Sequence, residues 1–323
     1  MLHSYSVSNK KLQKDHHKGG KLSEDLAWID LIEPSKEEEK LVEDFLGIDI
    51  PTREEMAEIE LSSRFYEKGD ALYMTATILA RTEHDEPGAH ALTFILAKEK
   101  LVTVRYVDPT PFKVFTSTAQ RIACQTHQGE ALLSGLLDAF INRIADLLEG
   151  GDRQIDDISR RIFRDQGLVK KKETKIFQTV LKELGLAADL ISKTQESLVS
   201  IQRLITFLIP NLNPKAKTCL KTLDTVNRDA IALREHTSYL IDKTNFLLDA
   251  TLGLINIQQN DIMKLFSIVA VCFMPSTLVV GFFGTNFKTM PLLDWNYGFE
   301  FSLFLMIATL ILSFLLFRRK GWL

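Results

Sequence analysis

The first long apolar stretch of the sequence ends in a short turn of small and polar residues, Gly284-Thr285-Asn286, within the run VVGFFGTNFKTMP. A glycine lets the backbone turn tightly, and an asparagine offers amide and carbonyl groups to a polar ligand. A simple membrane anchor needs neither residue at the end of an apolar helix. The turn therefore indicates contact with a polar group or an ion.

A stripe of residues at steps of three or four leads along one helix face toward this turn. It is acidic and polar first, then apolar, then polar again, and its members are Asp242, Asp249, Asn256, Asn260, Met263, Ser267, Ala270, Met274, Thr277 and Gly281. If several copies surrounded an axis, the aspartates would form rings that attract cations and the methionines would form apolar constrictions. A solvated helix face and ordinary helix packing explain the same residue types, so both interpretations stay open.

Two uncharged stretches follow one another near the C-terminal end, 265–284 and 301–317. As helices they would be roughly 30 and 25 Å long, enough to cross a bilayer, the second only just. Three cations follow the second stretch, whereas the segment between the two has one lysine and two acids. Positive charge stays on the cytoplasmic side. We therefore expect an integral protein of the cell (inner) membrane with two spans and both termini in the cytoplasm.

The remaining chain divides by its patterns of hydrophobicity. We predict a flexible tail over 1–22, a cytoplasmic α/β domain over 23–125, a helical hairpin over 126–213, a long helix over 214–284 that continues into the first span, an external loop over 285–300, the second span over 301–317 and a basic cytoplasmic tail over 318–323. A helix of about 70 residues with apolar positions on several sides needs neighbours, which favours a symmetric oligomer.

Several functional classes lack their sequence signals. No phosphate-binding Gly-x-x-x-x-Gly-Lys loop and no serine or cysteine nucleophile motif with a histidine partner is present, so we expect neither ATP-driven transport nor an enzyme. The three cysteines are scattered, and no clustered basic face indicates nucleic-acid binding. We expect no covalently bound cofactor.

The arrangement resembles the CorA family of divalent-cation transporters over nearly the whole chain. The resemblance is carried by FMPSTLVVGFFGTNF, by Met290-Pro291, by Trp295 with the Tyr-Gly that follows, and by cations before the final Trp-Leu. It implies an α+β cytoplasmic domain with long helices and two C-terminal transmembrane helices in a funnel-shaped pentamer. The first span would line the pore, and Asn286 would meet the hydrated ion. Mg²⁺ or another divalent cation would be substrate and regulator, with Asp242 and Asp249 as metal-binding residues.

The sequence departs from the family signature at Thr285, where the family has methionine and its zinc-transporting ZntB branch commonly has isoleucine. The external loop has Leu292-Leu293 where magnesium-transporting members usually have glutamate, which weakens the electrostatic attraction of Mg²⁺. Mg²⁺ is favoured because it prefers oxygen ligands and retained waters. A ZntB-like, proton-coupled zinc transporter and a non-conducting membrane-anchored scaffold or sensor remain the alternatives.

Overall fold

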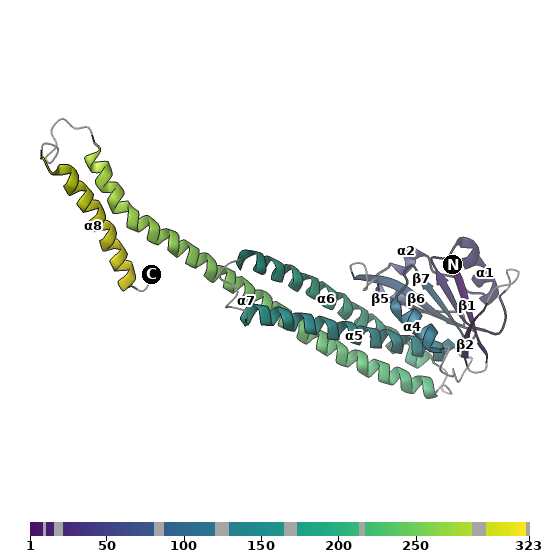
Figure 1. The fold of residues 1–323 in the computed structure, drawn as a ribbon. Coiled ribbons are helices and arrows are strands. Elements are labelled where there is room, and N and C mark those ends of the chain that lie inside the picture. The colour runs from purple at the N-terminus through teal and green to yellow at the C-terminus, as the bar shows by residue number, and fades with distance from the viewer. Residues whose placement is uncertain are drawn as a thin grey trace. The chain divides into compact units, whose positions relative to one another are not determined.

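The computed structural model describes residues 1–8, 11–15, 22–80, 87–119, 129–164, 173–212, 217–285 and 295–320. The chain forms two compact units, Met1–Leu248 and Asp249–Leu323. A sheet and several helices make up the first unit, and two helical segments make up the second (Figure 1). Each unit is described separately below.

A mixed sheet of seven strands forms one side of the first unit. Its strands are β1 Leu2–Ser8, β2 Lys11–Asp15, β3 Leu26–Ile32, β4 Phe65–Lys68, β5 Ala71–Ala80, β6 Gly88–Ala97 and β7 Lys100–Arg105. Their spatial order is β2-β1-β3-β7-β6-β5-β4. Strands β3 and β7 pair in parallel, and every other pair is antiparallel. The central strands are almost wholly buried because their sequences are nearly continuous apolar runs.

Two hairpins form part of the sheet. Strands β4 and β5 are joined at Gly69, whose φ of 62° suits a glycine, and β6 and β7 are joined by Lys98 and Glu99. The latter two residues have φ values of 49° and 61°, as a tight two-residue hairpin turn requires at both central positions. These turns fix the register of the sheet.

The predicted flexible tail over residues 1–22 is wrong where the structure describes it. Strand β1 pairs with β3, and β2 pairs with β1, so the first residues extend the sheet. The physical reason is tertiary: Tyr5 stacks on the buried Trp28 with ring centroids 4.6 Å apart, and Leu12 is only 1% exposed. A strand made of alternating serines and single apolar residues has little local signal, and its partner strand stabilises it.

Four shorter helices complete the α+β part, namely α1 Lys36–Leu46, α2 Arg53–Met56, α3 Leu61–Arg64 and α4 Thr110–Ala119. Helix α1 begins with a capping box between Ser35 and Glu38, and α2 begins with one between Thr52 and Glu55. Val42 and Leu46 of α1 join the core beneath the sheet. The predicted α+β fold is confirmed.

Three long helices lie beside one another in the first unit: α5 Gly129–Phe163, α6 Glu173–Asn211 and the first part of α7 Lys217–Phe283 (Figure 1). Ion pairs and hydrogen bonds join them, including Arg161 of α5 with Glu183 of α6 and Arg234 of α7 with Gln202 of α6. Buried positions of α7 repeat at steps of three, four or seven, as in a coiled-coil seam: Leu223, Val226, Ala230, Thr237, Leu240, Thr244 and Leu247.

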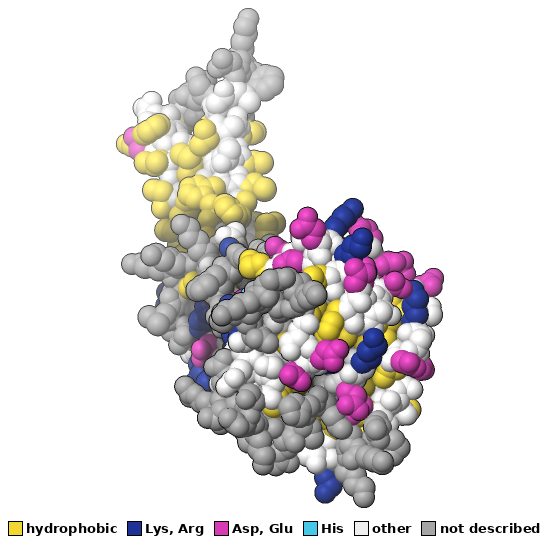
Figure 2. All heavy atoms as spheres, turned by 90° about the vertical axis from the view of Figure 1, so that its right-hand side faces the viewer, with side chains coloured by type: hydrophobic (Ala, Val, Ile, Leu, Met, Phe, Trp, Pro, Cys, Tyr) yellow, Lys and Arg dark blue, Asp and Glu magenta, His cyan; other side chains and the backbone are white. Residues whose placement is uncertain are grey.

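The second unit contains the end of α7 and helix α8 Gly298–Arg319. Both helices are long and apolar enough to cross a membrane, and almost none of their most apolar segments is buried inside the chain. Figure 2 shows hydrophobic side chains crowded on these helices, whereas the visible face of the first unit also carries many acidic and basic side chains. A soluble core helix would bury such a surface, so a bilayer and neighbouring helices account for it better.

Candidate functional site

Helix α7 carries all the described residues of the predicted stripe. Each of them is exposed in the single chain: Asp242, Asp249, Asn256, Asn260, Met263, Ser267, Ala270, Met274, Thr277 and Gly281. The side chains of Met263 and Met274 are 64% and 65% exposed. For the residues from 249 onward, this surface belongs to the second unit alone. Among the described residues of the second unit, none covers the stripe along most of its length.

Helix α8 packs against a different side of α7. In residues 252–285 the two buried side chains are Ile268 and Val279, and Ser276 bonds to α8. At about 100° per residue, Val279 lies about 60° around the helix from Ser276. Gly281 and Met274 lie about 140° and 160° from Ser276 by the same count. The stripe and the α8 contact thus occupy nearly opposite faces of α7.

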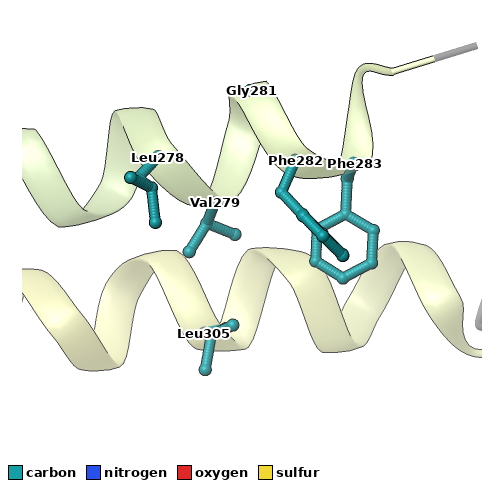
Figure 3. Close-up of a pocket in the computed structure, with 6 residues that line it drawn as sticks. All are labelled: Leu278, Val279, Gly281, Phe282, Phe283 and Leu305. Atoms are coloured by element: carbon teal, nitrogen blue, oxygen red, sulfur yellow. The ribbon is translucent and has the colours of Figure 1, made fainter.

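An open apolar hollow marks the contact between the two helices near the end of α7. Figure 3 shows Val279 and Phe283 of α7 directed toward α8, with Leu305 on the facing helix. Gly281 borders the hollow on the far side of α7, and a Cβ atom built there would meet no atom within 4 Å. In the described part of the second unit, no neighbouring atom requires residue 281 to be small.

The hydroxyl groups on the stripe bond to their own helix. Ser267 donates to the Met263 carbonyl at 2.8 Å, and Thr277 donates to the Phe273 carbonyl at 3.0 Å. This back-bonding is usual for serine and threonine in membrane helices. Each oxygen keeps lone pairs that an ion or its hydration water can use.

The predicted mouth is described only in part. Helix α7 ends at Phe283, and the Gly284 N–H donates to the Val280 carbonyl at 2.8 Å. The Thr285 hydroxyl donates to the Phe282 carbonyl, also at 2.8 Å. Asn286 lies outside the described residues, as do the predicted departures of the external loop at 292–294. The helix end thus shows the turn beginning at Gly284.

Asp242 and Asp249 lie on the exposed side of α7, away from its buried seam. Asp242 is about 160° around the helix from Leu240. In the described part of the chain, no group of three or more histidine, cysteine, aspartate or glutamate residues is placed to hold a metal ion. Metal binding at Asp242 and Asp249 therefore stays a prediction.

A neighbouring lysine has a role that the sequence did not reveal. Lys243 of α7 donates to Asp152 of α5 at 2.9 Å and to Asp156 at 2.7 Å. Burial disfavours the charged lysine, but the bonds to both carboxylates prevail and raise the pKa of Lys243. The same lysine holds the pKa of Asp156 below its usual value. Two aspartates at i and i+4 on a predicted helix were the available signal.

The first unit also contains a buried ionic cluster that the sequence analysis missed. Arg105 of β7 donates through Nε and Nη2 to the two oxygens of Asp30 of β3, at 3.0 and 2.9 Å. Thr103 donates to the same carboxylate at 2.7 Å, and Arg105 also bonds Asp108. Isolated charged residues inside apolar strands were the only sequence signal. The cluster joins the parallel strand pair and is far from the stripe in sequence.

Comparison with known proteins gives consistent similarities. A family model described as CorA-like Mg²⁺ transporter protein matches residues 23–319. A protein of Haemophilus ducreyi named magnesium transport protein CorA is 32% identical over 325 residues, covering 100% of both chains. A solved structure of the CorA magnesium transporter from Methanocaldococcus jannaschii superposes with a TM-score of 0.78 at 19% identity, covering 100% of this chain and 99% of that one.

A further solved structure, the ZntB cytoplasmic domain from Vibrio parahaemolyticus, superposes with a TM-score of 0.59 at 9% identity. It covers 79% of this chain and 97% of the solved chain. At this identity the likeness concerns the fold alone.

Proposed function

Because the chain belongs to the CorA-like Mg²⁺ transporter family, we propose that it transports divalent cations across the cell (inner) membrane and that Mg²⁺ is its substrate. The full-length identity of 32% to a magnesium transport protein carries this proposal. The two apolar C-terminal helices supply the membrane-spanning segments. The basic residues in the last turn of α8, Arg318 and Arg319, and at its C-cap, Lys320, favour cytoplasmic termini. The function is transport and not catalysis.

The transporting form is a homopentamer in this proposal. Support comes from α7, whose apolar side chains are exposed on several sides of the single chain, including Phe273 at 58% and Leu278 at 73%. The bilayer covers lipid-facing residues but not the polar stripe. The open space around Gly281 suits the close approach of a neighbouring helix.

The stripe lines the pore in the pentamer. Its position opposite the α8 contact supports this assignment, because α8 then lies outside the ring of α7 helices. Ser267, Thr277, Asn256 and Asn260 offer oxygen atoms to a hydrated ion, which suits Mg²⁺ because this ion gives up its waters reluctantly. Gly284, Thr285 and Asn286 form the mouth, where Asn286 contacts the hydrated ion.

Cytoplasmic Mg²⁺ regulates the pore. Met263 and Met274 lie 11 residues apart, or roughly 16 Å along the helix, and form the two apolar constrictions of a neck that has Ser267 and Ala270 between them. A hydrated divalent ion crosses such a neck only when it widens. Ions bound between copies at Asp242 and Asp249 relieve the repulsion between carboxylates and keep the bundle narrow. When internal Mg²⁺ falls, repulsion favours the wide state.

Uptake into proteoliposomes tests the proposal. The purified protein should take up Mg²⁺ without ATP, and Asn286→Ala should abolish the uptake while light scattering still gives a pentamer. Asn211→Ala is the matched control, because Asn211 is exposed at the end of α6 and its side-chain amide donates to the Phe207 carbonyl of the same helix. Zn²⁺ uptake that requires a proton gradient, without Mg²⁺ uptake, would replace the substrate assignment. No uptake of either ion would favour the scaffold alternative.

A further inference from the structure

A polar contact joins the two apolar helices of the second unit. The Ser276 hydroxyl of α7 lies 3.1 Å from the Met306 carbonyl oxygen of α8, to which it donates, and 3.4 Å from the Thr309 hydroxyl oxygen. The Thr309 hydroxyl also donates to the Met306 carbonyl, at 2.9 Å. Two hydroxyl groups thus converge on one backbone carbonyl. The contact is partly buried and lies well inside both apolar segments.

Ser276 directly follows Pro275, the single proline inside α7. A proline lacks an N–H group, so the carbonyl four residues earlier, at Val271, loses its normal helical donor. Helices bend most readily at such a position. The Ser276 contact therefore attaches the outer segment of α7, residues 276–283, to α8 immediately beyond the weakest point of the helix.

Apolar packing alone gives this segment little preference for one rotation about its axis. In a bilayer the lipid chains are as apolar as leucine, so turning one apolar face outward in place of another changes the free energy little. Packing against α8 is also incomplete here, since an open hollow of about 590 Å³ lies beside Val279 and Leu305 (Figure 3). A directional hydrogen bond can supply the missing preference.

We propose that Ser276 is a positioning residue that sets the rotation of the outer part of α7 on α8. With Ser276 held against Met306, Thr277 and Gly281 lie about 100° and 140° away around the helix and point away from α8. The consequence for ion transport rests on the proposed function, because it requires that this opposite face lines the pore. The positioning itself does not require transport.

Intrachain cross-linking measures the rotation without any transport assay. In a background with the three native cysteines replaced, one protein carries Val279→Cys with Leu305→Cys, and a second carries Gly281→Cys with Leu305→Cys. A protease site inserted in the 286–294 segment reveals cross-linked chains, because the two fragments stay joined after cleavage. The first pair should cross-link faster than the second, since Val279 points toward α8 and Gly281 does not.

Ser276→Ala should lower the ratio of the two cross-linking rates by about threefold to about twentyfold, the range expected for loss of one interhelical hydrogen bond in a membrane. Ser276→Thr, which keeps the hydroxyl, should restore the ratio. Thr309→Val should have a smaller effect, because Ser276 keeps its bond to the Met306 carbonyl. Ser302→Ala is the matched control: the Ser302 hydroxyl donates to the Phe299 carbonyl within α8 and should not affect the ratio.

Mg²⁺ uptake is then measured with the same Ser276 substitutions in the protein with its natural loop and cysteines. Reduced uptake together with a reduced cross-linking ratio supports both the positioning role and the pore face. A reduced ratio with unchanged uptake supports the positioning role and contradicts the pore face. An unchanged ratio with Ser276→Ala overturns the proposal, whatever happens to uptake.

Discussion

Removing the Asp30 carboxylate should destabilise the first unit more than removing any surface carboxylate. The side chains of Asp30 and Arg105 are only 2% and 4% exposed, and three hydrogen bonds reach the carboxylate. Burial opposes the charge on Arg105, but its bonds to Asp30 and Asp108 raise the pKa of the guanidinium. Asp30→Ala would leave this charged group buried beside β3.

The size of the destabilisation depends on the interaction partners that Arg105 retains in Asp30→Ala. Removing one partner of a buried ion pair typically lowers the free energy of unfolding by about 3–5 kcal/mol. Arg105 would retain Asp108 at 2.6 Å, the Val107 carbonyl at 2.9 Å and the Phe112 ring at 4.2 Å. Asp108 is itself 46% exposed, so it compensates only in part. We therefore expect a loss near the lower end, about 3 kcal/mol.

Thermal unfolding of the purified full-length protein, followed by circular dichroism, provides the assay. At about 2–4 °C per kcal/mol, the midpoint should fall on the order of 10 °C. The matched control Asp224→Ala removes an exposed i,i+4 pair with Arg228 and should cost about 0.5 kcal/mol or less. Replacing both partners, Asp30→Asn with Arg105→Met, should cost less than Asp30→Ala alone, because no charge stays buried. Equal midpoints for Asp30→Ala and Asp224→Ala would refute this account of the cluster.

Three further predictions concern the ion pairs of Lys243 between helices, the buried Tyr5 and the apolar constriction at Met274. Lys243→Met should destabilise the first unit by about 1 kcal/mol, and added Mg²⁺ should offset part of this loss because Asp152 and Asp156 are then left without their cation. Urea unfolding with and without Mg²⁺ measures both effects. An unchanged stability would show that these ion pairs between helices are unimportant. Burial, then the nearby Asp30, raise the pKa of Tyr5 from 10.0 to about 12. The unfolded chain loses the Tyr5 proton at a lower pH than the folded chain, so the contribution of this group to the folding stability is complete below pH 10 and is lost as the pH rises toward 12. Tyr5→Phe should therefore reduce the fall of the unfolding midpoint between these two pH values. An unchanged slope would contradict the assignment. Met274→Gly should raise Mg²⁺ flux both with and without internal Mg²⁺, and unchanged flux in a conducting protein would place the stripe on the wrong face.

The sequence was most informative where a pattern repeats over many residues. The long helix predicted over 214–284 appears as α7, and the hairpins near Gly69 and Lys98 have turn residues between apolar runs. Each of these signals is local, because helix periodicity and turn chemistry depend on residues close together in the chain. The two apolar segments predicted near the C-terminal end form the last part of α7 and helix α8, and both have mostly exposed surfaces.

Features that depend on distant partners were not predictable in the same way. Strands β1 and β2 exist because β3 accepts them, and the pairing of Arg105 with Asp30 joins residues 75 positions apart. The choice of Met306 and Thr309 as partners of Ser276 also depends on how α8 packs, which no spacing within α7 determines. Asn286, the residue on which the predicted mouth depends most, lies outside the described residues and stays a prediction.

The two faces of α7 carry different kinds of information. The face toward α8 combines Ile268, Ser276 and Val279, a mixture that resembles the rest of the helix in composition and shows no clear pattern in the sequence. The opposite face was predicted from its order of residue types, acidic, then apolar, then hydroxyl and glycine. Packing within one chain gives no reason for that order, since Met274 is 65% exposed and Gly281 has open space around it. An ordered pattern that the described residues of its own chain leave uncovered is expected when that face meets other copies of the chain and the space between them. For this reason the stripe, and not the packed face, supports the proposed pore.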